Sequence, residues 1–173
     1  MEVVEYQGAK IHKWQAGAST FLARPEAGAR LMNWHIAMAD GSTRDVIYWP
    51  VNDDLSNLAK VRGGNPILFP FCGRSYHEGE IGYWQAQDGV RRPMPMHGFA
   101  RGGTFEIEDL DERDFTAVLQ PGEKDRECYP YQYKFSVIYR FHELSIDVEL
   151  RLINRDDKDI PWSAGHHFYF QLP

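Results

Sequence analysis

The chain has 173 residues, of which 43% are hydrophobic and 14% aromatic, so it can bury the core of one domain and is not a disordered segment. Its net charge of −6 and the absence of any Lys/Arg run argue against a nucleic-acid partner. The N-terminus has no basic segment followed by an apolar one, and no apolar run is long enough to cross a bilayer. We therefore expect a cytoplasmic protein with no signal peptide and no membrane contact.

Short strands separated by turns are predicted for the first third of the chain. Residues 20–23 and 29–36 have strand character and flank a turn at 24–28, which contains a proline and a glycine. Residues 45–49 form another short strand that ends at a proline. The stretch 52–60 is compatible with a helical turn, but no segment of the chain keeps a period of 3.6 residues.

The middle of the chain, residues 61–103, breaks this pattern. It is rich in glycine and proline and also carries histidines, arginines and aromatic residues. Long irregular segments on a rigid sheet commonly hold binding and catalytic residues. We therefore expect the functional site to draw on this segment.

Two hairpins are predicted after it. Residues 104–108 and 115–119 form the first, and residues 131–141 and 144–152 form the second, with His142 and Glu143 as its turn. In the second hairpin apolar and aromatic residues alternate with polar ones, which is typical of half-buried strands. The sequence therefore predicts an all-β protein made of antiparallel sheets, as a sandwich or a barrel.

The seven histidines divide into several groups. We expect structural or solvated roles for His12, His35 and His142, which have no polar neighbours in the sequence pattern. For His97, set between prolines and a glycine, a structural and a functional role are both open. His166 and His167 lie at the start of an aromatic strand expected over residues 165–172. Because neighbouring side chains of a strand point to opposite faces, the two histidines are not expected to share a metal ion.

Other chemistries have little support in the sequence. It has no phosphate-binding glycine loop and no nucleophile motif of the G-x-S-x-G type. Cys72 and Cys128 are expected to be two reduced thiols, with a disulfide between them as the alternative. An acid–base site made of histidine and arginine on β structure remains, and nearby aromatic rings suit the apolar faces of sugars.

Four segments in order then resemble one known family. They are residues 62–70 (RGGNPILFP), 73–74 (GR), 97–101 (HGFAR) and 165–173 (GHHFYFQLP), which resemble the aldose 1-epimerase, or galactose mutarotase-like, superfamily. The resemblance implies an antiparallel β-sandwich of the supersandwich type. It also implies an enzyme that interconverts the α and β anomers of an aldose by opening the sugar ring, with no metal and no organic cofactor.

The resemblance assigns roles to individual residues. His167 matches the family's general acid, and histidine suits that role because its unperturbed pKa of about 6.5 lets it exchange a proton near neutrality. His97 matches a second active-site histidine that holds the ring or its hydroxyls. Arg74 matches an arginine that contacts sugar hydroxyls. We expect His167, rather than His166, to face a cleft with His97 and Arg74 nearby.

A further part of the resemblance concerns phosphate. Arg62 and Arg101 occupy the places of two arginines that hold the phosphate in the hexose-6-phosphate branch of the family, and we expect them to meet at the rim of the cleft. A third basic residue of that branch is replaced by Met94, for which the neighbouring Arg91 and Arg92 are candidate substitutes. The resemblance therefore implies a small-molecule substrate, either a sugar or a sugar phosphate. The sequence leaves a homo-oligomer open.

The resemblance also limits the expected activity. The family's general base is a glutamate on a later strand, so we expect residues 1–173 to be a single β-sandwich domain that forms the N-terminal part of a mutarotase-like fold, incomplete at its C-terminus. The base is expected beyond Pro173, and 1–173 alone should show little or no mutarotase activity. A non-catalytic sugar-binding protein on the same fold is the alternative function.

Overall fold

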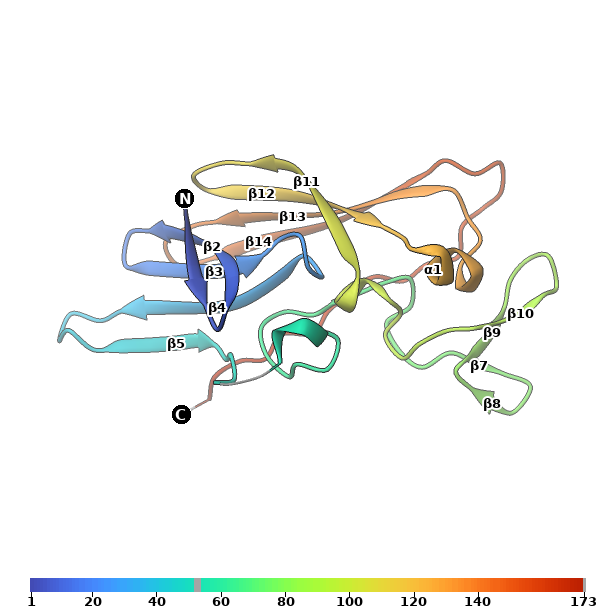
Figure 1. The fold of residues 1–173 in the computed structure, drawn as a ribbon, viewed down its shortest axis with the longest axis horizontal. Helices are drawn as coiled ribbons and strands as arrows, with labels where there is room; N and C mark the ends of the chain where they lie inside the picture. Colours follow the sequence, from blue (N-terminus) through green and yellow to red (C-terminus); the bar gives the residue numbers. More distant parts are fainter. Residues whose placement is uncertain (52–53, 173) are drawn as a thin grey trace.

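Two antiparallel sheets form most of the molecule. The computed structural model describes residues 1–51 and 54–172, so Asn52 and Asp53 of the predicted helical turn and Pro173 of the last motif lie outside the described residues. The strands of the first sheet lie in the order β1-β2-β3-β4-β5, and those of the second in the order β11-β12-β13-β14. In Figure 1 the strands β12 to β14 run along the long axis of the molecule, above the strands β2 to β5.

The first sheet is a meander of consecutive hairpins. Its strands are β1 (Glu2–Tyr6), β2 (Ala9–Ala16), β3 (Ser19–Arg24), β4 (Arg30–Ala37) and β5 (Thr43–Ile47). The strands predicted at 20–23, 29–36 and 45–49 are confirmed as β3, β4 and β5. In β3 buried and half-buried residues alternate, so one face of the strand points into the core.

The second sheet contains both predicted hairpins. Its strands are β11 (Thr104–Leu110), β12 (Asp114–Gln120), β13 (Tyr133–Phe141) and β14 (Ile146–Asn154). The residues of β13 predicted to face the core do so, because Phe135, Val137 and Tyr139 are fully buried. The predicted half-buried character is wrong for the middle of the strand, since Ser136 and Ile138 on the other face are buried as well. The turn is longer than predicted: the N–H of His142 donates to the carbonyl of Ser145, and Leu144 is 71% exposed in the turn rather than in a strand.

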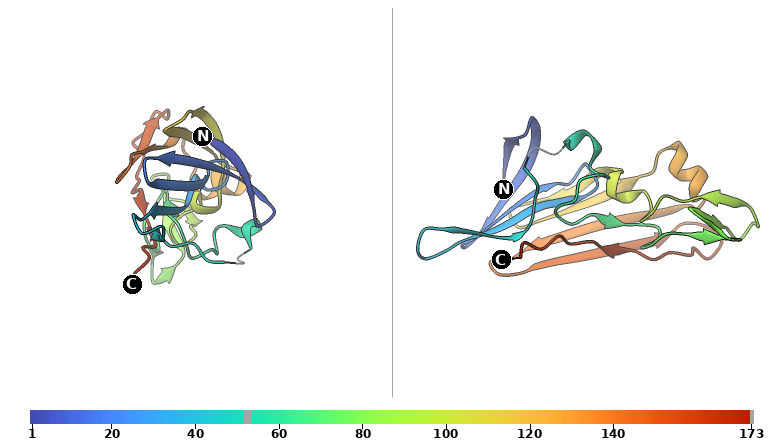
Figure 2. Two further views of the ribbon diagram at one scale, coloured as in Figure 1. Left: turned by 90° about the vertical axis from the view of Figure 1, so that its left-hand side faces the viewer. Right: turned by 90° about the horizontal axis from the view of Figure 1, so that it is seen from below.

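The core lies between the two sheets and is rich in aromatic rings. Phe21 of β3 stacks on Phe141 of β13 at 4.7 Å between ring centroids, and Trp14 of β2 lies 5.5 Å from Phe115 of β12. Figure 2 shows the two sheets as layers when the molecule is seen from its end and from below. This packing confirms an all-β sandwich-like fold, since each sheet buries one face against the other.

The segment that connects the two sheets along the chain, between β5 and β11, forms short elements. These are the 3₁₀ turns η1 (Leu55–Asn57) and η2 (Ala100–Gly102) and the strands β6 (Ile67–Leu68), β7 (Tyr76–His77), β8 (Glu80–Ile81), β9 (Tyr83–Gln85) and β10 (Arg91–Pro93). The hairpins β7–β8 and β9–β10 lie at the end of the molecule away from β5 (Figure 1). The one-turn helix α1 (Glu123–Cys128) was not predicted, because six residues are too few for a helical period to appear.

The aromatic segment near the C-terminus is less regular than predicted. Only β15 (Gly165–His166) is a strand, paired with β6, and Phe170 forms an isolated bridge to Ile47 at the end of β5. The prediction of one continuous strand over 165–172 is therefore wrong. The physical reason is Pro66, which accepts a bond from the N–H of His167 but has no N–H to return.

Two further predictions can be compared with the structure. Cys72 and Cys128 are both free, so the disulfide alternative is wrong. Within residues 1–51 and 54–172, no helix combines the length and the apolar character needed to cross a bilayer.

Candidate functional site

A basic, histidine-containing cavity lies where three segments of the chain meet. Its volume is about 560 Å³. The first segment precedes β6, the second runs from the end of β10 through η2, and the third follows β15. The lining residues are Ala59, Lys60, Val61, Arg62, Pro66, Leu68, Met96, His97, Arg101, His167 and Tyr169.

His97 reaches the cavity from a strained turn. Its φ is +67°, a left-handed conformation that is uncommon for a residue with a side chain. Its Nδ1–H donates to the carbonyl of Cys72 at 2.8 Å, since a carbonyl can only accept. This bond fixes the ring and leaves Nε2 as the nitrogen that can contact a ligand.

His167 faces the same cavity from the segment after β15. Its backbone N–H donates to the carbonyl of Pro66 at 3.2 Å and to Oδ1 of the buried Asn65 at 3.1 Å. Its ring lies 5.4 Å from that of His97 and 5.1 Å from that of Tyr169, between centroids. His97 and His167 are therefore brought together although 70 positions separate them in the sequence.

His166 lies on the opposite face of the segment. It does not line the cavity; its side chain is exposed on that other face, and its Nδ1 accepts a bond from Nδ2 of the buried Asn65 at 3.2 Å. Its ring packs against Phe168, whose ring in turn stacks on Phe170. The predicted alternation of faces is thus present even where regular strand pairing stops. His167, not His166, lines the cavity.

Three cationic side chains line this cavity. Arg62 and Arg101 both belong to it, as the sequence predicted, and Lys60 joins them from the same loop as Arg62. Within the described residues none of the three forms an ion pair with a carboxylate. An arrangement in which Arg62 and Arg101 pair with local carboxylates therefore finds no support among these residues. The cavity is suited to an anion.

Glycines allow the loops of the cavity to approach the sheet closely. A Cβ on Gly64 would lie 2.0 Å from the carbonyl oxygen of Leu31 in β4, and one on Gly28 would lie 2.6 Å from that of Arg101. Both glycines also have a positive φ. Gly64, two positions after Arg62, thus has a steric role as well as a conformational one.

Arg74 is placed differently from the other predicted residues. It is exposed and is not among the residues that line the cavity. Its Nε–H points at Sδ of Met96 at 3.4 Å, and Met96 itself lines the cavity. The structure therefore places Met96, rather than the Arg74 guanidinium, at the cavity wall.

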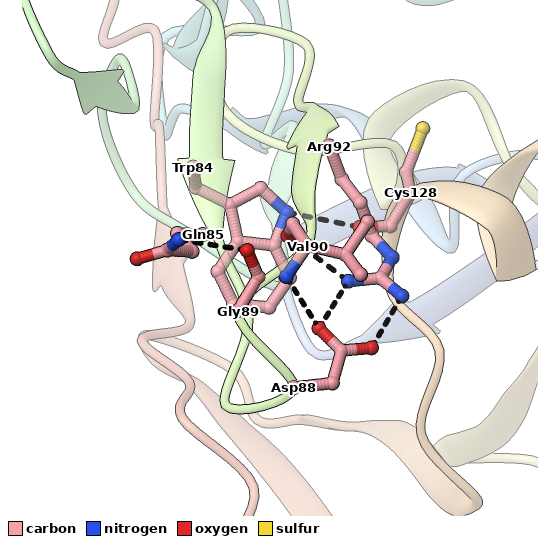
Figure 3. Close-up of polar contacts among 7 residues, drawn as sticks. All are labelled: Trp84, Gln85, Asp88, Gly89, Val90, Arg92 and Cys128. Atoms are coloured by element: carbon pink, nitrogen blue, oxygen red, sulfur yellow. Dashed lines mark hydrogen bonds and ion pairs between the residues drawn. The ribbon is translucent and has the colours of Figure 1, made fainter.

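Arg91 and Arg92 do not serve the cavity, so the prediction that they substitute for a third basic residue is wrong. Arg92 forms two bonds to the carboxylate of Asp88, at 2.8 and 2.6 Å, and Figure 3 shows this pair within the β9–β10 hairpin. The Arg92 guanidinium lowers the pKa of Asp88 to about 2. Arg91 pairs with Glu80 and covers the ring of Tyr83.

Carboxylates are absent from the described lining of the cavity. Elsewhere, Glu80 and Asp88 are paired with arginines in the small hairpins, and Glu149 pairs with Arg151 and Arg140 on the second sheet. In the described part of the chain no three His, Cys, Asp or Glu side chains are grouped as metal ligands would be.

The three histidines assigned structural roles each have a polar partner, so the expectation that they lack one is wrong. His12 lies 3.0 Å from Glu26, His35 lies 2.8 Å from Asn33, and His142 lies 3.0 Å from Asp147. In each case the partner comes from the same sheet or an adjoining turn. None of the three lines the histidine-containing cavity.

Sequence reasoning missed three residues that shape the site: Lys60, Asn65 and Arg30. Lys60 could have been noticed, because alternate residues of an extended chain share a face and Arg62 is two positions away. Asn65 and Arg30 are fully buried polar residues. Nothing in their local sequence distinguishes them from the exposed residues that Asn and Arg commonly are.

The molecule is thus an antiparallel β-sandwich with a loop-built cavity that contains two histidines and three cationic side chains. The chain belongs to the aldose 1-epimerase family, whose model matches residues 10–173. A galactose mutarotase-like protein from Lactobacillus casei superimposes with a TM-score of 0.75 at 21% identity, over 94% of this chain and 50% of that one. At that identity the likeness concerns the fold.

Two curated relatives extend the comparison. The plasmid LacX protein of Lactococcus lactis is 30% identical over 64% of this chain and 38% of its own length. A protein of Escherichia coli named "Putative glucose-6-phosphate 1-epimerase" is 23% identical over 84% of this chain and 43% of its own length. The chain thus spans less than half of each of these relatives.

Proposed function

We propose that the cavity binds an aldose that carries an anionic group, such as a hexose phosphate, and that the protein acts as an aldose 1-epimerase on it. The observation that carries this proposal is the convergence of His167 and His97 with three cations that have no carboxylate partner among the described residues. The histidines would contact the ring, and Lys60, Arg62 and Arg101 the anion. The name of the Escherichia coli relative supports the same substrate class.

The proposed chemistry needs one acid and one base. His167, as imidazolium, donates a proton to the ring oxygen while the bond from that oxygen to C1 breaks. The proton of the anomeric hydroxyl passes to the base, which yields the open aldehyde. Rotation about the C1–C2 bond and closure on the other face give the second anomer. His97, held by Cys72, positions the sugar through Nε2.

A second function is favoured by one specific observation. No carboxylate belongs to the described lining of the cavity, so those residues provide no glutamate or aspartate base. A protein with this cavity alone would bind the sugar without interconverting its anomers. We therefore retain a non-catalytic sugar-binding role as the alternative to an epimerase.

One experiment distinguishes the two functions. Exchange between the α and β anomers of glucose 6-phosphate and of glucose is followed by NMR magnetisation transfer, with and without the protein, and binding is measured by calorimetry. Acceleration by the wild-type protein that falls by about 10²–10⁴-fold in His167→Ala supports the epimerase. Binding without acceleration supports the alternative, and neither binding nor acceleration refutes both.

Two matched variants make the assignment of residues specific. His166→Ala is the control for His167→Ala, since its ring lies on the other face and does not line the cavity. Arg91→Gln is the control for Arg62→Gln, because Arg91 is paired with Glu80 outside the cavity. Arg62→Gln should weaken binding of glucose 6-phosphate much more than binding of glucose.

A further inference from the structure

A fully buried arginine bonds to the two loops that carry the cations of the basic cavity. Arg30 is the first residue of β4, and none of its surface is exposed. Its Nη1 donates to the carbonyl of Gly63 at 2.9 Å, and its Nη2 donates to the carbonyls of Leu58 at 2.8 Å and of Arg101 at 3.2 Å. One guanidinium therefore holds three backbone carbonyls from two separate loops.

These carbonyls belong to the segments that carry the cavity cations. Gly63 follows Arg62 directly, Leu58 precedes Lys60 by two residues, and the third carbonyl is that of Arg101 itself. The planar fork of a guanidinium fixes the directions of the bonds that it donates. The Arg30 side chain therefore fixes the distance between the two loops, and so the distance between the cationic side chains that they carry.

The charge of Arg30 has no local counterion. Its partners are all carbonyls, it forms no ion pair with a described carboxylate, and its Nε has no hydrogen-bond partner among the described residues. The pKa of Arg30 is lowered to about 10, mainly by burial and to a smaller extent by the nearby charge of Arg101, so Arg30 stays charged at neutral pH. A buried, unpaired charge is costly, and an anion bound nearby would offset that cost.

We propose that Arg30 is a positioning residue for anion binding, which sets the arrangement of Lys60, Arg62 and Arg101 and adds a buried positive charge beneath the ligand. This inference rests on the proposed function in taking the anion to be part of the sugar substrate. Arg30 does not line the cavity, so it acts through the loops and through its field rather than by direct contact.

The test measures sulfate and glucose affinities separately by calorimetry. Arg30→Met keeps most of the side-chain volume and removes the charge, whereas Arg30→Lys keeps the charge and loses the fork. Arg24→Met is the matched control, because Arg24 also donates to a loop carbonyl, that of Leu55 at 3.1 Å, but does not line the cavity. Near-UV circular dichroism and urea unfolding report whether each variant is folded.

The expected result is selective for the anion. Arg30→Met should weaken sulfate binding by about tenfold, equivalent to about 1.4 kcal/mol, and leave the glucose affinity unchanged. The sulfate affinity of Arg30→Lys should lie between those of Arg30→Met and the wild type. The sulfate affinity of Arg24→Met should equal that of the wild type. If Arg30→Met does not fold, the sulfate affinity of Arg30→Lys decides. Sulfate affinity that is unchanged in a folded Arg30 variant, or sulfate and glucose affinities reduced equally, would overturn the inference.

The outcome for the proposed function is separate. A wild-type protein that binds sulfate, and loses this binding selectively in the Arg30 variants, supports the inference even if no sugar binds and the proposed function fails. A wild-type protein that binds no sulfate overturns the inference, while anomer exchange on neutral glucose still tests the epimerase.

Discussion

The turn that carries His97 depends on a glycine that contacts the end of β6. Gly98 has a φ of +71°, and a Cβ there would lie 1.9 Å from the carbonyl oxygen of Phe69. The same oxygen accepts bonds from the backbone N–H groups of Phe99 and Ala100, at 2.9 and 3.3 Å. Because the obstructing atom is backbone, Gly98→Ala must separate two segments that form the wall of the cavity.

Gly89 is a matched control for the magnitude. Its φ is +77°, but a Cβ there has no heavy atom within 4 Å. Gly89→Ala therefore adds only the strain of a left-handed residue, about 1–2 kcal/mol. Gly98→Ala adds the same strain and also steric overlap, for which about 1–3 kcal/mol is typical of overpacked positions. We expect Gly98→Ala to be the less stable variant by that second amount.

Urea unfolding monitored by tryptophan fluorescence measures the difference, provided that the dependence on urea is the same for both variants. Calorimetric titration with glucose 6-phosphate gives a second readout, because a displaced His97 should weaken binding only in Gly98→Ala. Equal losses of stability in Gly98→Ala and Gly89→Ala would refute the reasoning. They would show that the turn can move away from Phe69 without cost.

Two further predictions concern buried and paired polar groups. Asn65→Ala removes the hydrogen bond that Asn65 donates to the hydroxyl of Tyr139, 2.7 Å long, and the one that it accepts from the N–H of His167. This variant should lower the free energy of unfolding in urea by about 1–3 kcal/mol. An unchanged unfolding midpoint would contradict this prediction. Asp88→Asn should lower stability at neutral pH, because Arg92 depresses the pKa of Asp88 in the folded state from 3.8 to about 2. A depressed carboxyl pKa stabilises the fold above the unfolded value, so the difference between wild type and Asp88→Asn should shrink as the pH falls from about 4 towards 2. A difference that stays constant over this interval would argue against the pair.

The strands were predictable because alternation is a local property of the chain. Phe135, Val137 and Tyr139 share a face wherever β13 is placed, and the same period separates His166 from His167. The ordered motifs around Arg62 and His97 likewise indicated the family before any tertiary contact was known. Local patterns of this kind need no information from distant residues.

The cavity itself was decided by tertiary structure. Sequence spacing suggested Arg91 and Arg92 as the additional cations, but Asp88 and Glu80 hold them in the small hairpins, and Lys60 lines the cavity instead. Asp88 is close to Arg92 in sequence, yet only the hairpin geometry shows that the two side chains meet in a bidentate pair. Competition among several partners for one guanidinium is settled by distance and burial, which a sequence does not contain.

The sequence by itself therefore determined the fold class, the faces of the strands and which histidine of the last motif lines the cavity. Only the tertiary structure showed that Arg30 is buried and joins the loops of Gly63 and Arg101, which are 38 positions apart. The physical reason is that periodicity reports the direction of a side chain relative to its neighbours along the chain. Its surroundings depend on the packing of segments that are remote in sequence.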